Sequence, residues 1–173
     1  MIYTERYEGV VDRSGWESGP WDGEPDKAVW VDEATGLDCM IVRQERSGHL
    51  CGYVGVGPDH PWHGVGYYGC VNEACTADED ESHYECSPDS RVSVHGGVTF
   101  AEGCIPDDSG PERGICHIEQ PGRPDPVWWF GFDCRHFNDR SPKHDTWEQG
   151  EYRTYDYVQG EVQSLAAQIA GVR

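Results

Sequence analysis

Long hydrophobic runs are missing from this 173-residue chain, in which hydrophobic residues make up only 36% of the sequence. A membrane-spanning helix needs roughly 20 consecutive apolar residues, and the N-terminus lacks the apolar core of a secretion signal. We therefore expect no membrane span and a cytoplasmic location. With 22 Gly and 11 Pro, the composition predicts short strands, long loops and a modest core.

Basic residues are scarce as well, since 13 Lys and Arg face 32 Asp and Glu and leave a net charge of -19. A surface this acidic repels nucleic acid, which argues against non-specific binding to DNA or RNA. The same charge suits an acidic interaction module that docks on another protein and inhibits it. Docking on a protein is therefore one functional hypothesis.

Eight cysteines are many for a cytoplasmic protein, because reducing conditions there disfavour disulfides. Metal binding or buried thiols are the favoured interpretations, and Cys39 and Cys51 fit the second because they lie within strand patterns. The acidic loop over residues 69–90 would stay ordered if a structural Zn2+ stapled it, with free thiols as the alternative. The candidate ligands are Cys70, Cys75 and Cys86, with His83, Cys104, Cys116 or His117 as the fourth.

Short apolar runs between glycine-containing turns predict a meander of antiparallel strands. Two further runs, over residues 91–101 and 127–134, predict a pair of neighbouring central strands. We expect residues 1–27 to form an extended N-terminal arm and residues 28–173 to form a single α+β domain. The meander strands are expected over residues 28–32, 37–44 and 49–56.

Apolar residues spaced four, three and four apart near the C-terminus predict an amphipathic helix over residues 155–170. Thr154 is a suitable N-cap for it, and Gly171 is a suitable stop. We expect the apolar stripe to pack on the sheet. The stripe consists of Val158, Val162, Leu165 and Ile169.

The two central strands each separate an apolar face from a face with small or polar side chains. On this second face lie His95 and Gly97 in the first strand, and Trp129, Gly131 and Asp133 in the second. Glycine within a strand often marks the close approach of a ligand, and an exposed Trp ring could stack on a planar group. The pattern predicts a pocket for a small polar ligand, with a nucleotide as one candidate.

A cluster of cations follows the second central strand and stands out in a chain this acidic. It could hold a phosphate or carboxylate, although the alternative is that it pairs with neighbouring acidic residues such as Asp139. Two histidines in a proline-containing loop, His60 and His63, are candidate lid residues. The cluster consists of Arg135, His136, Arg140, Lys143 and His144.

Metal-dependent hydrolysis is a further hypothesis for the same residues. Asp133, His136 and His95 could bind a metal that activates water, which makes them the catalytic candidates. Cys134 beside His136 could also act as a nucleophile. Strand alternation places Cys134 on the core face, however, so an inert buried thiol is the favoured interpretation.

Two blocks of sequence are specific: His-Gly-Gly-Val-Thr-Phe at residues 95–100 and Trp-Trp-Phe-Gly-Phe-Asp-Cys-Arg-His at residues 128–136. Together with residues 51–61 and 157–168, they resemble a group of small proteins encoded by bacteriophages and prophages. The resemblance covers about residues 24–170 and implies an origin but no activity. It implies a phage accessory protein in the cytoplasm of an infected bacterium, where it could sequester a nucleotide signal of host defence or inhibit a host enzyme.

Overall fold

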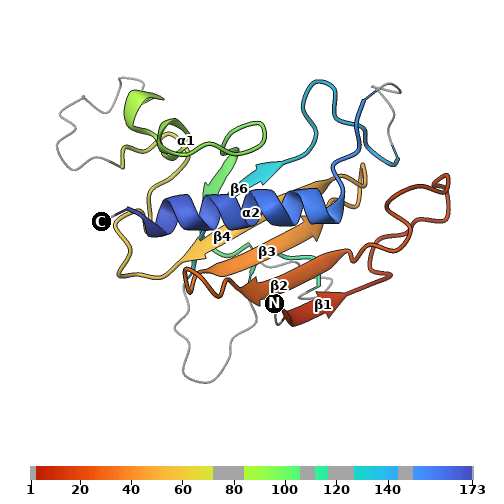
Figure 1. The fold of residues 1–173 in the computed structure, drawn as a ribbon, viewed down its shortest axis with the longest axis horizontal. Helices are drawn as coiled ribbons and strands as arrows, with labels where there is room; N and C mark the ends of the chain where they lie inside the picture. The colour runs from red at the N-terminus through yellow and green to blue at the C-terminus, as the bar shows by residue number, and fades with distance from the viewer. Residues whose placement is uncertain (1–2, 72–83, 106–111, 117–126, 144–149, 173) are drawn as a thin grey trace.

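The computed structural model describes residues 3–71, 84–105, 112–116, 127–143 and 150–172. These residues form a six-stranded antiparallel sheet of order β1-β2-β3-β4-β6-β5, with the long helix α2 lying across it (Figure 1). This arrangement confirms the predicted α+β class. The strands are β1 (Tyr3–Tyr7), β2 (Lys27–Val31), β3 (Asp38–Arg43), β4 (Leu50–Val56), β5 (Phe100–Glu102) and β6 (Trp128–Asp133), and the helices are η1 (Tyr84–Cys86), α1 (Pro88–Arg91) and α2 (Tyr155–Ala170).

Helix α2 covers the face of the sheet formed by β3 and β4 (Figure 1). Its bounds agree with the predicted residues 155–170, and the Thr154 hydroxyl accepts the backbone N–H of Tyr157 as an N-cap should. A Cβ on Gly52 of β4 would lie 2.6 Å from Val162, so this glycine lets the helix approach the sheet closely. The apolar stripe of Val158, Val162, Leu165 and Ile169 is fully buried.

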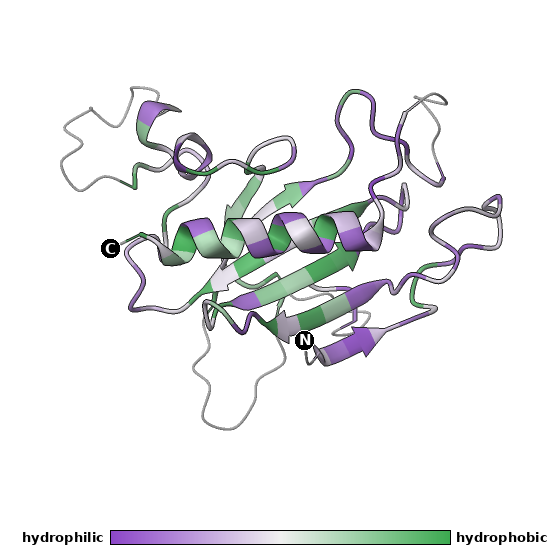
Figure 2. Ribbon diagram, viewed as in Figure 1, coloured by the Kyte–Doolittle hydropathy of each residue, from purple (hydrophilic) through white to green (hydrophobic). Residues whose placement is uncertain are grey.

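The expected N-terminal arm contains β1, which pairs with β2 and extends the sheet by one edge strand. Figure 2 shows β1 as hydrophilic, which suits a strand at an exposed edge because charged side chains discourage pairing with other chains. Farther along the arm, Trp21 is buried edge-on against Tyr152. Residues before position 28 therefore contribute both to the sheet and to the packing.

The predicted strand over residues 91–101 is wrong for most of its length. Residues 88–91 form α1, and strand pairing starts at Phe100, where β5 joins β6. Gly96 and Gly97 have φ of 69° and 86°, a left-handed conformation that interrupts a strand. The Gly97 N–H donates to the Val94 carbonyl and closes a turn there. His95 therefore lies in a loop next to the sheet.

The zinc staple is not supported, because four of its candidate ligands are paired as disulfides, Cys70 with Cys86 and Cys104 with Cys116. Their Cα atoms lie 4.9 and 4.6 Å apart, which is normal spacing for a disulfide. A sulfur in a disulfide is not the thiolate that zinc requires. The described residues contain no group of three or more metal-binding side chains. The other candidates, Cys75, His83 and His117, lie outside those residues.

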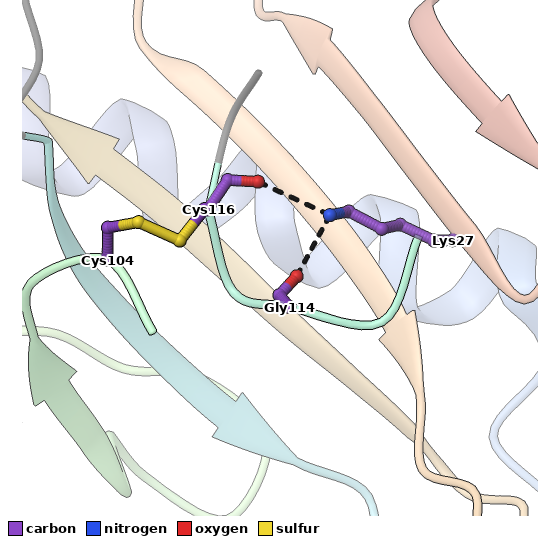
Figure 3. The surroundings of a disulfide bond; sticks show 4 residues. All are labelled: Lys27, Cys104, Gly114 and Cys116. Atoms are coloured by element: carbon purple, nitrogen blue, oxygen red, sulfur yellow. Dashed lines mark hydrogen bonds between the residues drawn. A yellow bond between two sulfur atoms is a disulfide. The ribbon is translucent and has the colours of Figure 1, made fainter. Parts of the chain in front are cut away.

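The Cys104–Cys116 disulfide fixes a loop over the face of the sheet opposite α2 (Figure 3). Beneath this loop, the Lys27 ammonium donates to the carbonyls of Gly114 and Cys116 at 2.9 and 3.3 Å. Burial lowers the pKa of Lys27, because water no longer solvates its charge. The disulfide therefore holds the acceptors that keep this buried cation satisfied.

Removal of the second disulfide gives a direct test of disulfide against zinc. The double variant Cys104→Ser/Cys116→Ser should lose about 3 kcal/mol of unfolding free energy, as expected for a loop of this length. Because dithiothreitol reduces both disulfides, urea titrations of wild type in its presence should show a loss at least as large. Urea titrations with EDTA should show no change. Sensitivity to EDTA together with indifference to the reductant would instead favour a bound metal.

Candidate functional site

Polar side chains gather where β6 ends, beside the loop over residues 92–99 and the first turns of α2. We call His95, Asp133, His136, Asp139 and Tyr157 the histidine site. Beyond β6 the chain turns back through Asn138, whose φ of 70° is one that Asn tolerates. This turn brings Asp139 and His136 back toward the strand end.

The loop that carries His95 runs alongside α2. Near the C-terminal end of the helix, the Ser93 N–H donates to the Gln168 side chain at 2.7 Å. Nearer to the N-terminal end of the helix, the His95 N–H donates to the Glu161 side chain at 2.7 Å. Tyr157, Glu161 and Gln168 share one side of the helix, because residues four and seven apart lie along a line. This polar stripe positions the His95 imidazole over Tyr157.

Both ring nitrogens of His95 are engaged. Nε2 lies 2.8 Å from Asp139 Oδ2, and Nδ1 lies 3.1 Å from the Tyr157 hydroxyl. A carboxylate only accepts hydrogen bonds, so Nε2 carries a proton, and in the Nε2–H tautomer Nδ1 accepts the hydroxyl proton of Tyr157. The site therefore contains a directed chain from tyrosine through imidazole to carboxylate.

Asp139 is the most deeply buried member of this hydrogen-bonded series, with a side chain that is only 1% exposed. It also accepts the His136 backbone N–H at 2.9 Å and the Arg153 guanidinium at 2.9 Å. Burial would raise the pKa of Asp139, but the hydrogen bonds from His95, His136 and Arg153 together hold that pKa below its ordinary value. Asp139 is accordingly a carboxylate at neutral pH.

His136 supplies a second imidazole, whose ring centre lies 5.6 Å from that of His95. Its Nε2 is 3.8 Å from Asp133 Oδ2, a carboxylate that also accepts the Thr99 hydroxyl. A Cβ on Gly96 would lie 1.9 Å from this Nε2, so only glycine leaves room for the ring. Among the described residues, Nε2 has no hydrogen-bond partner although solvent does not reach it.

The structure brings together His95, Asp133 and His136 of the predicted site, but not Trp129. Arg135 lies in the same segment, where its backbone N–H donates to Asp133 at 3.0 Å. Trp129 is 0% exposed and belongs to a second core, on the face opposite α2, with Met40 and Tyr53. The predicted alternation placed it on the correct face of β6, but that face is packed. Trp129 therefore cannot stack on a ligand in this structure, and the predicted pocket between the strands is corrected to a site at the strand end.

His60 and His63 lie away from the histidine site. His60 Nε2 contacts the Ile169 carbonyl at 3.2 Å, in the last turn of α2, and His63 packs on Trp128. Tyr157 and Ile169 are twelve residues apart on the helix, a rise of about 18 Å. Within the ranges that the structure describes, no contact supports the predicted lid role of these two histidines at the His95 site.

Residues that sequence reasoning missed are Tyr157 and Arg153. Tyr157 stands on the exposed side of the predicted helix, and the helical spacing of Tyr157, Glu161 and Gln168 could have marked a polar contact stripe. Nothing local links Arg153 to Asp139, because that contact depends on the return of the chain to the strand end. Cys134 is buried as predicted, and burial raises its thiol pKa, which makes it a poor nucleophile.

The buried His49 imidazole, next to this region, should make the folded state sensitive to acid. Burial is the main cause that lowers its pKa from 6.5 to about 4, and its Nδ1 contacts the Ser47 hydroxyl at 2.6 Å. Because the folded-state pKa lies below the unfolded one, this stability is complete above about pH 6.5 and is lost as the pH falls toward 4. Urea titrations at pH 7 and pH 4.5 should differ by about 2–3 kcal/mol through this group.

The variant His49→Gln isolates the contribution of His49 to the pH dependence of stability, since glutamine has no proton to gain in this range. Its unfolding free energy should change much less between pH 7 and 4.5 than that of wild type. Asp139 does not affect this comparison. Its pKa is lowered in the folded state, so the stability that its carboxylate contributes is lost only below about pH 4. Equal pH dependence of the two proteins would contradict a neutral buried His49.

Comparisons of the sequence with protein-family models and curated proteins, and of the fold with solved structures, gave no match. No helix in the described ranges has the length and hydrophobicity needed to span a membrane.

Proposed function

We propose that the protein binds a small polar ligand through a phosphate or carboxylate group at the histidine site, with a nucleotide as the favoured candidate. The observation that carries the proposal is the pair of imidazoles 5.6 Å apart, one of which, His136, directly follows the exposed Arg135 in the chain. Arg135 is exposed, and its guanidinium has no partner among the described residues. In a chain with a net charge of -19, such a group of potential cations favours an anion.

An exposed aromatic residue lies next to the proposed site in the chain. Phe137 directly follows His136 and is 73% exposed, which is unusual for a large hydrophobic residue. A flat ring of a ligand could stack on it, in the role that sequence reasoning gave to Trp129. The combination of anion and planar ring supports a nucleotide over a simple acid.

The arrangement of the residues proposed as metal ligands favours ligand binding over metal-dependent hydrolysis. The proposed metal ligands Asp133, His136 and His95 do not form a metal-binding group among the described residues. The resemblance to phage proteins adds the context of an accessory protein that removes a nucleotide signal from its infected host. Tight binding without turnover would be sufficient for that role.

Isothermal titration calorimetry with AMP, inorganic phosphate and adenosine tests the proposal. AMP should bind most tightly, phosphate more weakly, and adenosine least, because the anion provides the main contact. Arg135→Gln should weaken AMP binding about tenfold or more, the effect of losing one charge-assisted hydrogen bond. Arg46→Gln, which changes an exposed arginine elsewhere, is the matched control and should bind as wild type. Failure of AMP and phosphate to bind, or equal affinity of Arg135→Gln, would contradict the proposal.

A further inference from the structure

We propose that Tyr157 is a nucleophile, activated by His95 and positioned through Asp139, that accepts an acyl group from an activated carboxylic ester. The inference uses part of the histidine site but requires neither the phosphate contact nor Arg135. It depends on the arrangement typical of covalent catalysis, in which a hydroxyl contacts a base that a third group orients.

Hydrogen-bond direction is the first argument. Asp139 receives the His136 N–H and the Arg153 guanidinium, so it faces His95 as a further acceptor. His95 must then donate from Nε2, which leaves the lone pair of Nδ1 toward the Tyr157 hydroxyl at 3.1 Å. In serine hydrolases the same order of hydroxyl, imidazole and carboxylate activates the hydroxyl.

Tyr157 is also the most accessible of the three residues in this hydrogen-bonded series. The side chains of Asp139 and His95 are 1% and 12% exposed, whereas Tyr157 is 38% exposed. The carboxylate is therefore innermost, the base is shielded, and the nucleophile is open to a reactant. The hydroxyls of Tyr152 and Tyr155 are instead occupied by Glu24 and Tyr3 inside the protein.

The surroundings of the Tyr157 ring explain why a base is needed. Burial and the neighbouring Glu161 raise the pKa of Tyr157, so the phenol is protonated at neutral pH. His95 can accept this proton as the oxygen attacks. Arg153, 5.1 Å above the Tyr157 ring, acts in the opposite direction to burial and Glu161 and favours loss of the phenol proton.

The reaction balances without any oxidant or reductant. The phenol oxygen attacks the ester carbonyl carbon, a C–O bond forms, and the proton moves to His95 Nδ1. The tetrahedral intermediate then breaks its bond to the leaving alcohol oxygen, which takes the proton back from His95. The products are an ester of Tyr157 and the free alcohol.

The test uses p-nitrophenyl acetate with the intact protein. Release of p-nitrophenol gives the rate, and mass spectrometry of peptides locates the acetyl group. Wild type should be acetylated at Tyr157 ahead of the other eight of its 9 tyrosines. Tyr157→Phe should lose this adduct, and His95→Gln should slow its formation about 100-fold. Tyr68→Phe, at a tyrosine that is 81% exposed and contacts no histidine of the described segments, should react as wild type.

Asp139→Asn tests the positioning role by a separate signal. This variant should slow acetylation and also change the proton position on the His95 ring, measured by histidine 15N shifts, which a loss of stability alone would not do. Acetylation of Tyr68 as fast as Tyr157, or an unchanged rate in His95→Gln, would overturn the inference. If His95→Gln proves unfolded by circular dichroism, Tyr157→Phe at the exposed helix surface still decides the outcome. AMP binding with no acetylation would refute the nucleophile alone, and acetylation without AMP binding would refute the proposed function alone.

Discussion

Replacement of Arg43 by Met should lower the free energy of unfolding by about 3–5 kcal/mol, the cost of breaking a buried ion pair from one side. The Arg43 guanidinium is fully buried and donates to Asp26 at 3.1 Å and to Glu24 at 2.7 Å. It also donates to the Tyr152 hydroxyl and to the Gly48 carbonyl. One side chain therefore ties the segment before β2 to the segment before α2. Its loss leaves Glu24 without a cation among the described residues and leaves Asp26 with Arg13 alone.

Urea titrations of Arg43→Met and Arg6→Met at pH 7 measure this cost against a matched control. Arg6 pairs with Glu8 on the surface, so its replacement should change stability by about 0–1 kcal/mol. The double variant Arg43→Met/Glu24→Gln should recover part of the loss, since the uncompensated carboxylate of Glu24 is then gone. Similar values for Arg43→Met and Arg6→Met would show that the network does not stabilise the fold.

Substitution of Gly96 by Ala should both destabilise the protein and displace the His136 ring. A residue with a side chain costs about 1–2 kcal/mol in the left-handed conformation that Gly96 adopts. The added Cβ would also lie 1.9 Å from His136 Nε2, and overpacking of this kind costs about 1–3 kcal/mol. We expect a total loss of about 2–5 kcal/mol in thermal or urea unfolding, together with weaker AMP binding.

Gly64→Ala separates these two causes. Gly64 has φ of 83°, but a Cβ there would meet no atom within 4 Å, so this variant carries the backbone cost alone. In the double variant Gly96→Ala/His136→Ala, the steric term should disappear and the stability should approach that of Gly64→Ala. An equal cost for Gly96→Ala and Gly64→Ala would mean that His136 does not pack against the glycine.

Periodic hydrophobicity predicted those parts of the fold whose burial follows from local spacing. Residues such as Val158 and Leu165 of α2 are fully buried at the predicted positions, and β2, β3 and β4 end within a residue or two of their predicted bounds. The loop around Gly96 was mistaken for a strand because its valines resemble strand residues. Two consecutive glycines with positive φ override that apolar pattern.

The site was predicted in part, because a strand end limits where its polar residues can lie. Asp133 and His136 follow β6 directly, and β5 pairs with β6 as the neighbouring-strand hypothesis required. Alternation alone could not distinguish a face open to a ligand from one packed as a second core, which is why Trp129 was misassigned. Spacing likewise does not specify which cysteines form disulfides. The contact between Asp139 and His95 could not be predicted either, because it depends on the turn through Asn138.

The most direct test of the histidine site is a long-range 1H–15N correlation spectrum of the histidine side chains, recorded with increasing inorganic phosphate. We predict that free His95 carries its proton on Nε2, facing Asp139, and that phosphate shifts the His95 and His136 resonances together while His60 and His63 stay unchanged. A proton on Nδ1 of His95, or phosphate shifts no larger at His95 and His136 than at His60, would contradict a carboxylate-oriented imidazole pair that binds an anion.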